Sequence, residues 1–177
     1  MTTFLVLLLV LLTSSADNNS ANQKNGDRLL QNPENHIKDR PDILRPDSTI
    51  LYTGWYYVVD TPNGYKRQLL KSDEVYFLDP KPIMTAKNVK ASEIHENWLN
   101  NKQYFWLTMQ LDKEGTENWS YATRVAITKR LAFIIDNRLL QVVTVESQMT
   151  DGIAVLARAD FSRQEVEDFK TILENEK

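Results

Sequence analysis

The sequence predicts an α+β sandwich in which mostly antiparallel strands carry two helices on one face. Short runs rich in aromatic and β-branched residues, separated by Gly, Pro, Asn and Asp, predict a series of strands between residues 50 and 157. Two other stretches have apolar residues at helical spacing. The 177 residues are 42% hydrophobic and 25% charged, which is the composition of a globular protein.

The N-terminus has the pattern of an export signal. An unbroken apolar run extends from Phe4 to Leu12 and is followed by Ser14-Ser15-Ala16. A membrane span needs about 20 apolar residues, so this run suits the core of a signal peptide better. We expect residues 1–16 to be a signal peptide, although no Lys or Arg precedes the run. The preceding residues also resemble a lipoprotein signal with Ser15 in place of the lipidated cysteine, so plain cleavage and a replaced cysteine both stay open.

Residues 17–49 lack the apolar side chains that a folded core requires. They contain six Asn, three Pro and only six aliphatic residues. Such a segment cannot bury enough apolar surface to offset its chain entropy. We therefore predict a disordered polar tether that precedes a folded domain at residues 50–177.

The strands of this domain are predicted from local patterns. A run at 51–59, the turn Pro62-Asn63-Gly64 and a run at 65–70 predict a hairpin. A second hairpin is predicted at 131–145, because Asp136-Asn137 tolerates the positive φ of a tight primed turn. The remaining predicted strands are 75–78, a stretch around 83–94, 104–111 and 153–157.

Both predicted helices have an apolar stripe, and the second also has a capping signal. Trp119, Ala122 and Ala126 predict a helix from about 116 to 128. The sequence Ser162-Arg163-Gln164-Glu165 is a capping box, with Phe161 and Val166 as its hydrophobic staple. The buried face of this last helix is predicted to carry Val166, Phe169 and Leu173.

Composition excludes several kinds of chemistry. The chain has no cysteine, which removes disulfides, thiolate nucleophiles and cysteine-based zinc sites. Only His36 and His95 are present, and we expect His95 to be a surface or structural residue at a strand end or turn. No phosphate-binding glycine loop occurs, and the net charge of −3 argues against nucleic acid. We predict no metal, no cofactor and no catalytic residue, although a carboxylate pair would be invisible to sequence spacing.

Aromatic side chains are the strongest binding candidates. Side chains alternate across a strand, so Trp55 and Tyr57 share one face of the first strand and Tyr56 lies on the other. A face that no helix covers would present an aromatic patch for another chain. We predict Trp55, Tyr57 and Trp106 as contact residues. The alternatives are that both faces of the sheet are covered or that the rings lie flat under the tether at residues 17–49.

The segment from Tyr104 to Leu173 resembles a known family. It contains a strand ending in Leu111-Asp112, then Gly115 and Trp119, the strand 131–136, Gly152 before an apolar run, and Phe161-Ser162 opening a helix. This order is similar to the head of the first periplasmic domain of SecD and SecDF protein-export membrane proteins, and residues 82–89 are similar to the start of that head.

The resemblance implies a ferredoxin-like head on the outer side of a bacterial inner membrane or beyond it, without enzymatic activity and able to contact extended polypeptide. The membrane portion that couples ion flow to export in that family is absent from this sequence, so ion-driven translocation does not carry over. We expect an exported, periplasmic or envelope-facing module that binds a protein or extended polypeptide, with membrane attachment only through an N-terminal anchor. A small secreted hydrolase and a purely structural subunit are the alternatives, and the oligomeric state stays open.

Overall fold

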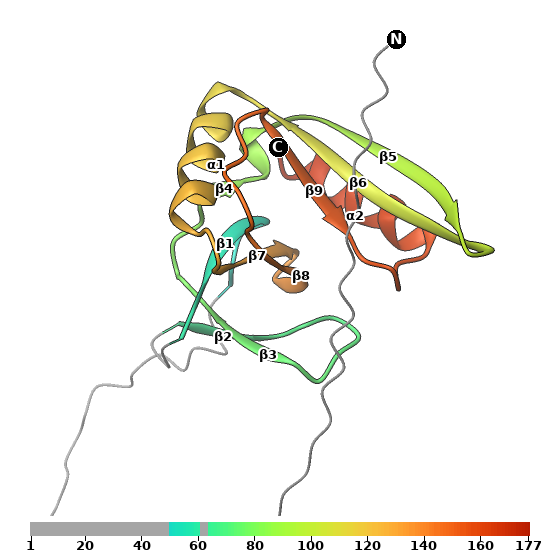
Figure 1. The fold of residues 1–177 in the computed structure, drawn as a ribbon, viewed down its shortest axis with the longest axis horizontal. Coiled ribbons are helices and arrows are strands. Elements are labelled where there is room, and N and C mark those ends of the chain that lie inside the picture. Colours follow the sequence, from blue (N-terminus) through green and yellow to red (C-terminus); the bar gives the residue numbers. More distant parts are fainter. Residues whose placement is uncertain (1–49, 61–63) are drawn as a thin grey trace, which may run out of the picture. The chain divides into compact units, whose positions relative to one another are not determined.

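The computed structural model describes residues 50–60 and 64–177, which form an α+β fold (Figure 1). The predicted signal peptide at 1–16 and the predicted tether at 17–49 lie outside the described residues. The elements in chain order are β1 (Gly54–Val59), β2 (Tyr65–Gln68), β3 (Val75–Leu78), β4 (Met84–Thr85), the 3-10 helix η2 (Ala86–Asn88), β5 (Val89–Leu99), β6 (Lys102–Leu111), α1 (Lys113–Val125), β7 (Arg130–Ile135), β8 (Arg138–Thr144), β9 (Ile153–Ala157) and α2 (Arg163–Asn175).

Most strands belong to one curled antiparallel sheet. Its order is β2-β3-β1-β7-β8, and β4 pairs with β1. The two outer strands approach each other at a parallel bridge between Leu69 and Leu139, and the Leu70 amide donates to the Leu139 carbonyl over 2.8 Å. The sheet therefore nearly closes on itself around a small apolar interior.

Tyr56 occupies that interior. Its ring is fully buried beside Leu78 and Ile134, and its hydroxyl donates to the Tyr52 carbonyl over 2.8 Å. Burial raises the pKa of Tyr56 to about 12, because the phenolate would lose its hydration. The hydroxyl thus stays a neutral donor that fastens residue 52 to the sheet.

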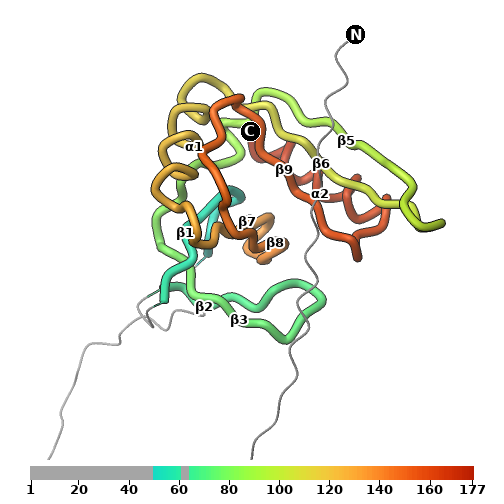
Figure 2. The backbone as a smooth tube through the Cα atoms, viewed as in Figure 1, coloured from blue at the N-terminus to red at the C-terminus, as the bar shows by residue number. Residues whose placement is uncertain are grey.

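A second sheet has the order β5-β6-β9 and is covered on one face by α2 (Figures 1 and 2). The main core lies between this layer and the curled sheet. It contains Leu107 and Met109 from β6, Leu156 from β9, and Phe169 from α2, together with the inner side chains of β1 and β7.

Both helices begin at side-chain caps. Asp112 accepts a hydrogen bond from the Gly115 amide over 2.6 Å at the start of α1. At α2 the Ser162 hydroxyl accepts from the Glu165 amide, and the Glu165 carboxylate accepts from the Ser162 amide over 2.9 Å. The predicted capping box is confirmed, as is the buried face with Val166, Phe169 and Leu173.

The tight turn between β7 and β8 is also confirmed. Asp136 and Asn137 have φ values of 48° and 60°, which the sequence Asp-Asn tolerates.

The first helix is confirmed with a shifted boundary, since it runs from Lys113 to Val125. Its predicted stripe is correct, because Trp119, Ala122 and Ala126 are all buried.

Two predictions about the strands differ from the structure. The predicted hairpin between 51–59 and 65–70 is wrong, because β1 pairs with β3 and β2 lies on the far side of β3. The α+β class and the mostly antiparallel strands are confirmed. The finer ferredoxin-like sandwich is not confirmed, because the strands divide between two sheets.

Within residues 50–60 and 64–177, no helix is long and apolar enough to cross a membrane.

Candidate functional site

The outer face of the β5-β6-β9 sheet carries a group of partly exposed aromatic and aliphatic side chains. In the register of β5 and β6, Ile94 pairs with Leu107 on the core side, and His95 pairs with Trp106 on the opposite side. Alternation then places every second residue of the three strands on this outer face. The partly exposed outer residues are His95, Tyr104, Trp106, Thr108, Ile153, Val155 and Ala157.

Trp106 is the centre of this outer face. Its ring stacks on the His95 ring, with 5.5 Å between centroids and 19° between planes. Nε2 of His95 lies 2.9 Å from the Thr108 hydroxyl, which holds the imidazole over the indole. Among the described residues, none of the outer-face side chains belongs to either core cluster. Helix α2 packs on the other side of the sheet (Figure 2).

The β9 edge of this sheet is occupied by side chains. The Ala157 amide donates to Oε1 of Gln141 over 2.8 Å, and the Ile153 carbonyl accepts from Nε1 of Trp119 over 3.2 Å. These contacts cap backbone groups that point away from β6. They leave β5 as the edge at which a further strand has room to pair.

Alternation identifies the backbone groups on the β5 edge. Trp106 and Gln110 of β6 lie opposite Ala157 and Ile153 of β9. These are non-bonded pairs, so Trp106 and Gln110 direct their own backbone groups toward β5, because antiparallel pairs alternate between bonded and non-bonded positions. The β5 residues between those bonded positions, Ser92, Ile94 and Glu96, therefore point outward. The Trp98 amide, which is in the same series, donates to Oδ1 of Asn97 instead of to β6.

Tyr57 lies at a different place, in a groove of about 520 Å³ beside α1. Residues Glu114, Asn118 and Tyr121 form one stripe of α1 along this groove, and Asp79 contributes a carboxylate. Burial raises the pKa of Tyr57, and the nearby Tyr121 and Asp79 raise it further. The groove therefore combines two phenol groups with carboxylates and an amide.

The three predicted contact residues do not form one surface. Trp55 is only 2% exposed, with its ring centroid 4.9 Å from both Trp119 and Phe133 in the core. A ring at this position cannot touch a partner while the fold is intact, so its assignment as a surface contact is corrected. Tyr57 lies on the same face of β1 as Trp55 and is half-buried at the groove. Trp106 lies on the outer face of the second sheet.

The pairing of His95 with Trp106 was not predicted from the sequence. His95 was expected at a strand end or turn, whereas the residue lies inside β5. The alternation of side chains along each strand gives the face on which His95 and Trp106 lie. Their pairing also needs the register between the two strands, which is set by the turn at Asn100 and Asn101. Both residues have positive φ, at 51° and 60°.

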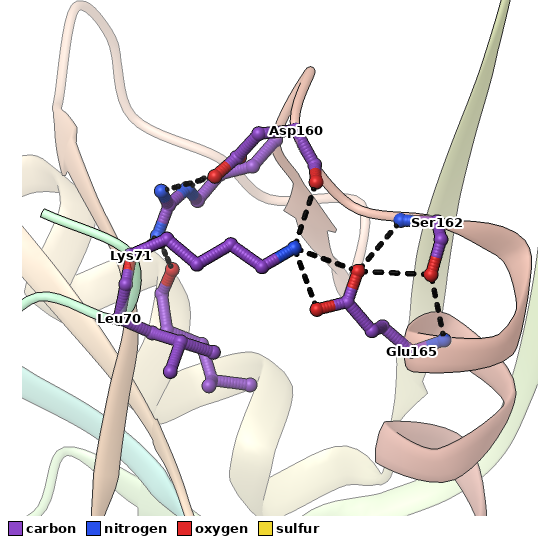
Figure 3. Close-up of polar contacts among 7 residues, drawn as sticks. Leu70, Lys71, Asp160, Ser162 and Glu165 are labelled. Carbon is purple, nitrogen blue, oxygen red and sulfur yellow. Dashed lines mark hydrogen bonds and ion pairs between the residues drawn. The ribbon is translucent and has the colours of Figure 1, made fainter.

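A polar cluster fastens α2 to the curled sheet (Figure 3). Nζ of Lys71 lies 2.6 Å from Oε1 of Glu165 and donates to the Asp160 carbonyl over 2.9 Å. Nη1 of Arg158 donates to the Leu70 carbonyl over 2.7 Å. The hydrogen bonds from Lys71 and from the Ser162 amide lower the pKa of Glu165 to about 2.

Residues 50–60 and 64–177 contain no group of three or more His, Asp and Glu side chains placed to hold a metal ion.

The described residues define an α+β domain in which a curled sheet packs against a three-stranded sheet, and α2 covers one face of that second sheet. The family model of the SecDF P1 head subdomain matches residues 63–176. The chain therefore belongs to the SecDF P1 head family, as its sequence resemblance indicated.

Two solved structures show the same fold. One is described as the crystal structure of SecDF in super-membrane-facing form, with a TM-score of 0.53, 18% identity and coverage of 68% of this chain and 18% of that chain. The other is described as the structure and function of a membrane component SecDF that enhances protein export, with a TM-score of 0.54, 17% identity and coverage of 68% and 60%. This chain thus spans only part of the length of either protein. The comparison with curated proteins gives no match.

Proposed function

We propose that this domain binds extended polypeptide on the outer face of the β5-β6-β9 sheet and takes part in protein export at the cell envelope without performing chemistry. The observation that carries the proposal is the open face centred on the Trp106–His95 stack. Contiguous apolar side chains that no element covers are typical of contact sites for other chains. Membership in the SecDF P1 head family supports a role in export.

The outer face suits an extended chain of varied sequence. Tyr104 and Trp106 offer large flat rings, and Val155 on β9 adds an aliphatic contact beside them. Rings of this kind bury much area at low entropic cost and accept many side chains. Because such contacts are apolar, we expect the affinity to be modest and only weakly dependent on salt.

The proposed place of action is outside the cytoplasm. The apolar run at residues 4–12, with small residues after it, supports export and cleavage before Asp17. The mature protein would then face the periplasm or the outer side of an envelope membrane. Intact-mass measurement of protein from the native host tests this step, and a mature chain that still begins at Met1 contradicts it.

The groove beside Tyr57 is the second candidate contact for polypeptide. Its volume of about 520 Å³ is in the range of ligand sites, and the exposed ring of Tyr121 lies on its wall. Tyr57 is half-buried, however, and the groove has no stacked ring pair like the one at Trp106. We therefore assign the main contact to the outer face.

A direct test uses a permanently unfolded, dye-labelled polypeptide and fluorescence anisotropy. Trp106→Ala is expected to weaken binding by about thirtyfold, since a buried aromatic anchor contributes about 2 kcal/mol. Trp98→Ala is the matched control. Trp98 is 64% exposed but lies on the opposite face of β5, so we expect less than a twofold effect.

The variants also separate the two candidate surfaces. Unchanged binding by a folded Trp106→Ala variant contradicts the outer-face assignment. If Tyr57→Ala removes binding while Trp106→Ala does not, the groove is the contact site. Turnover of a peptide or glycoside that one Asp or Glu substitution abolishes would instead favour the hydrolase alternative.

A further inference from the structure

The exposed edge of β5 is complementary to a second copy of itself. Ser92, Ile94 and Glu96 direct their backbone groups outward, and a bulge at Lys90 ends the regular edge. If two β5 strands pair antiparallel with Ile94 on the two-fold axis, Ile94 faces its own copy and Ser92 faces Glu96 of the second copy. Every outward backbone group between these residues then gains a partner.

Charge selects this register over its neighbours. With Ile94 on the axis, Glu93 of each copy lies opposite His95 of the other on the outer face. Glu93 has 77% of its side chain exposed, and its Oε2 lies 3.8 Å from Nε2 of His95 in the same strand. Moving the axis to position 93 brings Glu93 opposite itself, and like charges directly opposite each other are unfavourable. Moving it to position 95 places Glu93 opposite Asn97 and loses the contact with His95. The axis at Ile94 is therefore preferred.

The position of helix α2 beside β5 supports the same two-fold axis independently. The Ser92 hydroxyl donates to Oε1 of Glu174 over 2.8 Å, and Nη1 of Arg163 lies 3.2 Å from Oε2 of Glu96. The helix therefore runs antiparallel beside β5, with its middle level with Ile94. An axis through Ile94 brings the α2 helices of the two copies alongside each other in opposite directions.

The charges along that side of α2 match under this arrangement. Arg163, Glu167, Lys170 and Glu174 form one stripe of alternating sign, held by ion pairs of 2.9 Å and 3.0 Å within the helix. In two antiparallel copies centred between Glu167 and Lys170, Arg163 faces Glu174 and Glu167 faces Lys170. No like charges meet in this stripe.

We propose that this chain forms a two-fold symmetric homodimer by antiparallel pairing of β5 with β5 of a second copy. The product is a continuous six-stranded sheet with the order β9-β6-β5-β5-β6-β9. Its outer face carries two Trp106–His95 stacks side by side. The dimer does not depend on polypeptide binding and is tested without a polypeptide.

Sedimentation of the full chain over a range of concentrations tests the association. We expect reversible dimerisation. Glu93→Lys replaces two favourable cross-strand pairs and is expected to raise the dissociation constant about tenfold. Adding His95→Glu to Glu93→Lys places Lys opposite Glu at the same two positions and restores the dimer. Glu117→Lys, at an exposed position of α1, makes the same change in net charge and leaves the dimer unchanged.

Cysteine cross-linking tests the register, because the chain contains no cysteine of its own. The Glu93 and His95 positions of opposite copies form a non-bonded antiparallel pair with about 4.5 Å between Cα atoms, within the range of a disulfide. A mixture of Glu93→Cys and His95→Cys proteins should form a disulfide-linked heterodimer under mild oxidation. Each variant alone should form little.

Three results overturn the proposal. The first is a chain that stays monomeric at every concentration and does not cross-link in the mixture, which leaves the β5 edge to other occupants such as a polypeptide strand. The second is efficient cross-linking of either single variant alone, which shows a different axis. The third is a dimer that Glu93→Lys does not weaken.

Discussion

Phe169 is predicted to be the main anchor of α2. The side chain is 3% exposed, lies in the main core and meets Phe161 edge-on with 5.1 Å between ring centroids. Phe169→Ala removes this buried ring and leaves a cavity between α2 and the sheet. The expected loss in the free energy of unfolding is about 3–5 kcal/mol. A domain of this size has a total stability of about 5–15 kcal/mol, so the loss is a large share of it.

The comparison variant is Ser162→Ala at the start of the same helix. It removes the hydroxyl that caps the Glu165 amide over 3.3 Å, but the core stays filled. Loss of an N-cap costs about 0.5–2 kcal/mol. Thr171→Ala, at an exposed position of α2, serves as a control and should change stability by less than about 0.5 kcal/mol.

Urea unfolding followed by circular dichroism measures all three variants. We expect the midpoint to fall most for Phe169→Ala, less for Ser162→Ala and least for Thr171→Ala, with little change in the slope. If Ser162→Ala proves more damaging than Phe169→Ala, the packing of α2 on the sheet is not the main source of its stability, and the reasoning is wrong.

Two further changes test contacts elsewhere in the fold. Glu165 has a folded pKa of about 2 against an ordinary value of 4.5, so its ion pair with Lys71 stabilises the fold above pH 4.5 and loses that effect as the pH falls toward 2. With the carboxylate 29% exposed, we expect Glu165→Gln to cost about 1–2 kcal/mol at pH 7 and almost nothing near pH 2, measured by urea unfolding at both pH values. A pH-independent cost would contradict this prediction. Gly54→Ala should destabilise the domain by about 3 kcal/mol or more, because the added Cβ would lie 2.1 Å from the Met84 carbonyl oxygen. Thermal melting measures the change. A melting temperature near that of the parent protein would show that β1 and β4 separate easily.

Several local features were predictable because neighbouring residues decide them. The capping box at Ser162 and Glu165 depends on atoms three residues apart, and the structure has both of its hydrogen bonds. The Asp136-Asn137 turn depends on which residues tolerate positive φ. Tyr56 lies on the opposite face from Trp55, as alternation along a strand requires.

The candidate site was predictable only in part. An excess of aromatic side chains on strands predicted a contact surface and named Trp106, which does lie on an open face. The same reasoning named Trp55, which is covered by Trp119 and Phe133 from distant elements. Sequence patterns distinguish the two faces of a strand, but they do not say which face another element will cover.

The sequence by itself determined the class of the fold, the start of α2, the turn before β8 and the parity of each strand, because these depend on φ preferences and on side chains a few residues apart. Only the tertiary structure decided that β3 inserts beside β1, that the strands divide into two sheets, and that Trp106 rather than Trp55 is available to a partner. These outcomes depend on contacts between residues far apart in the chain. Their free energies come from burial shared among many side chains, and no local pattern specifies which of them will meet.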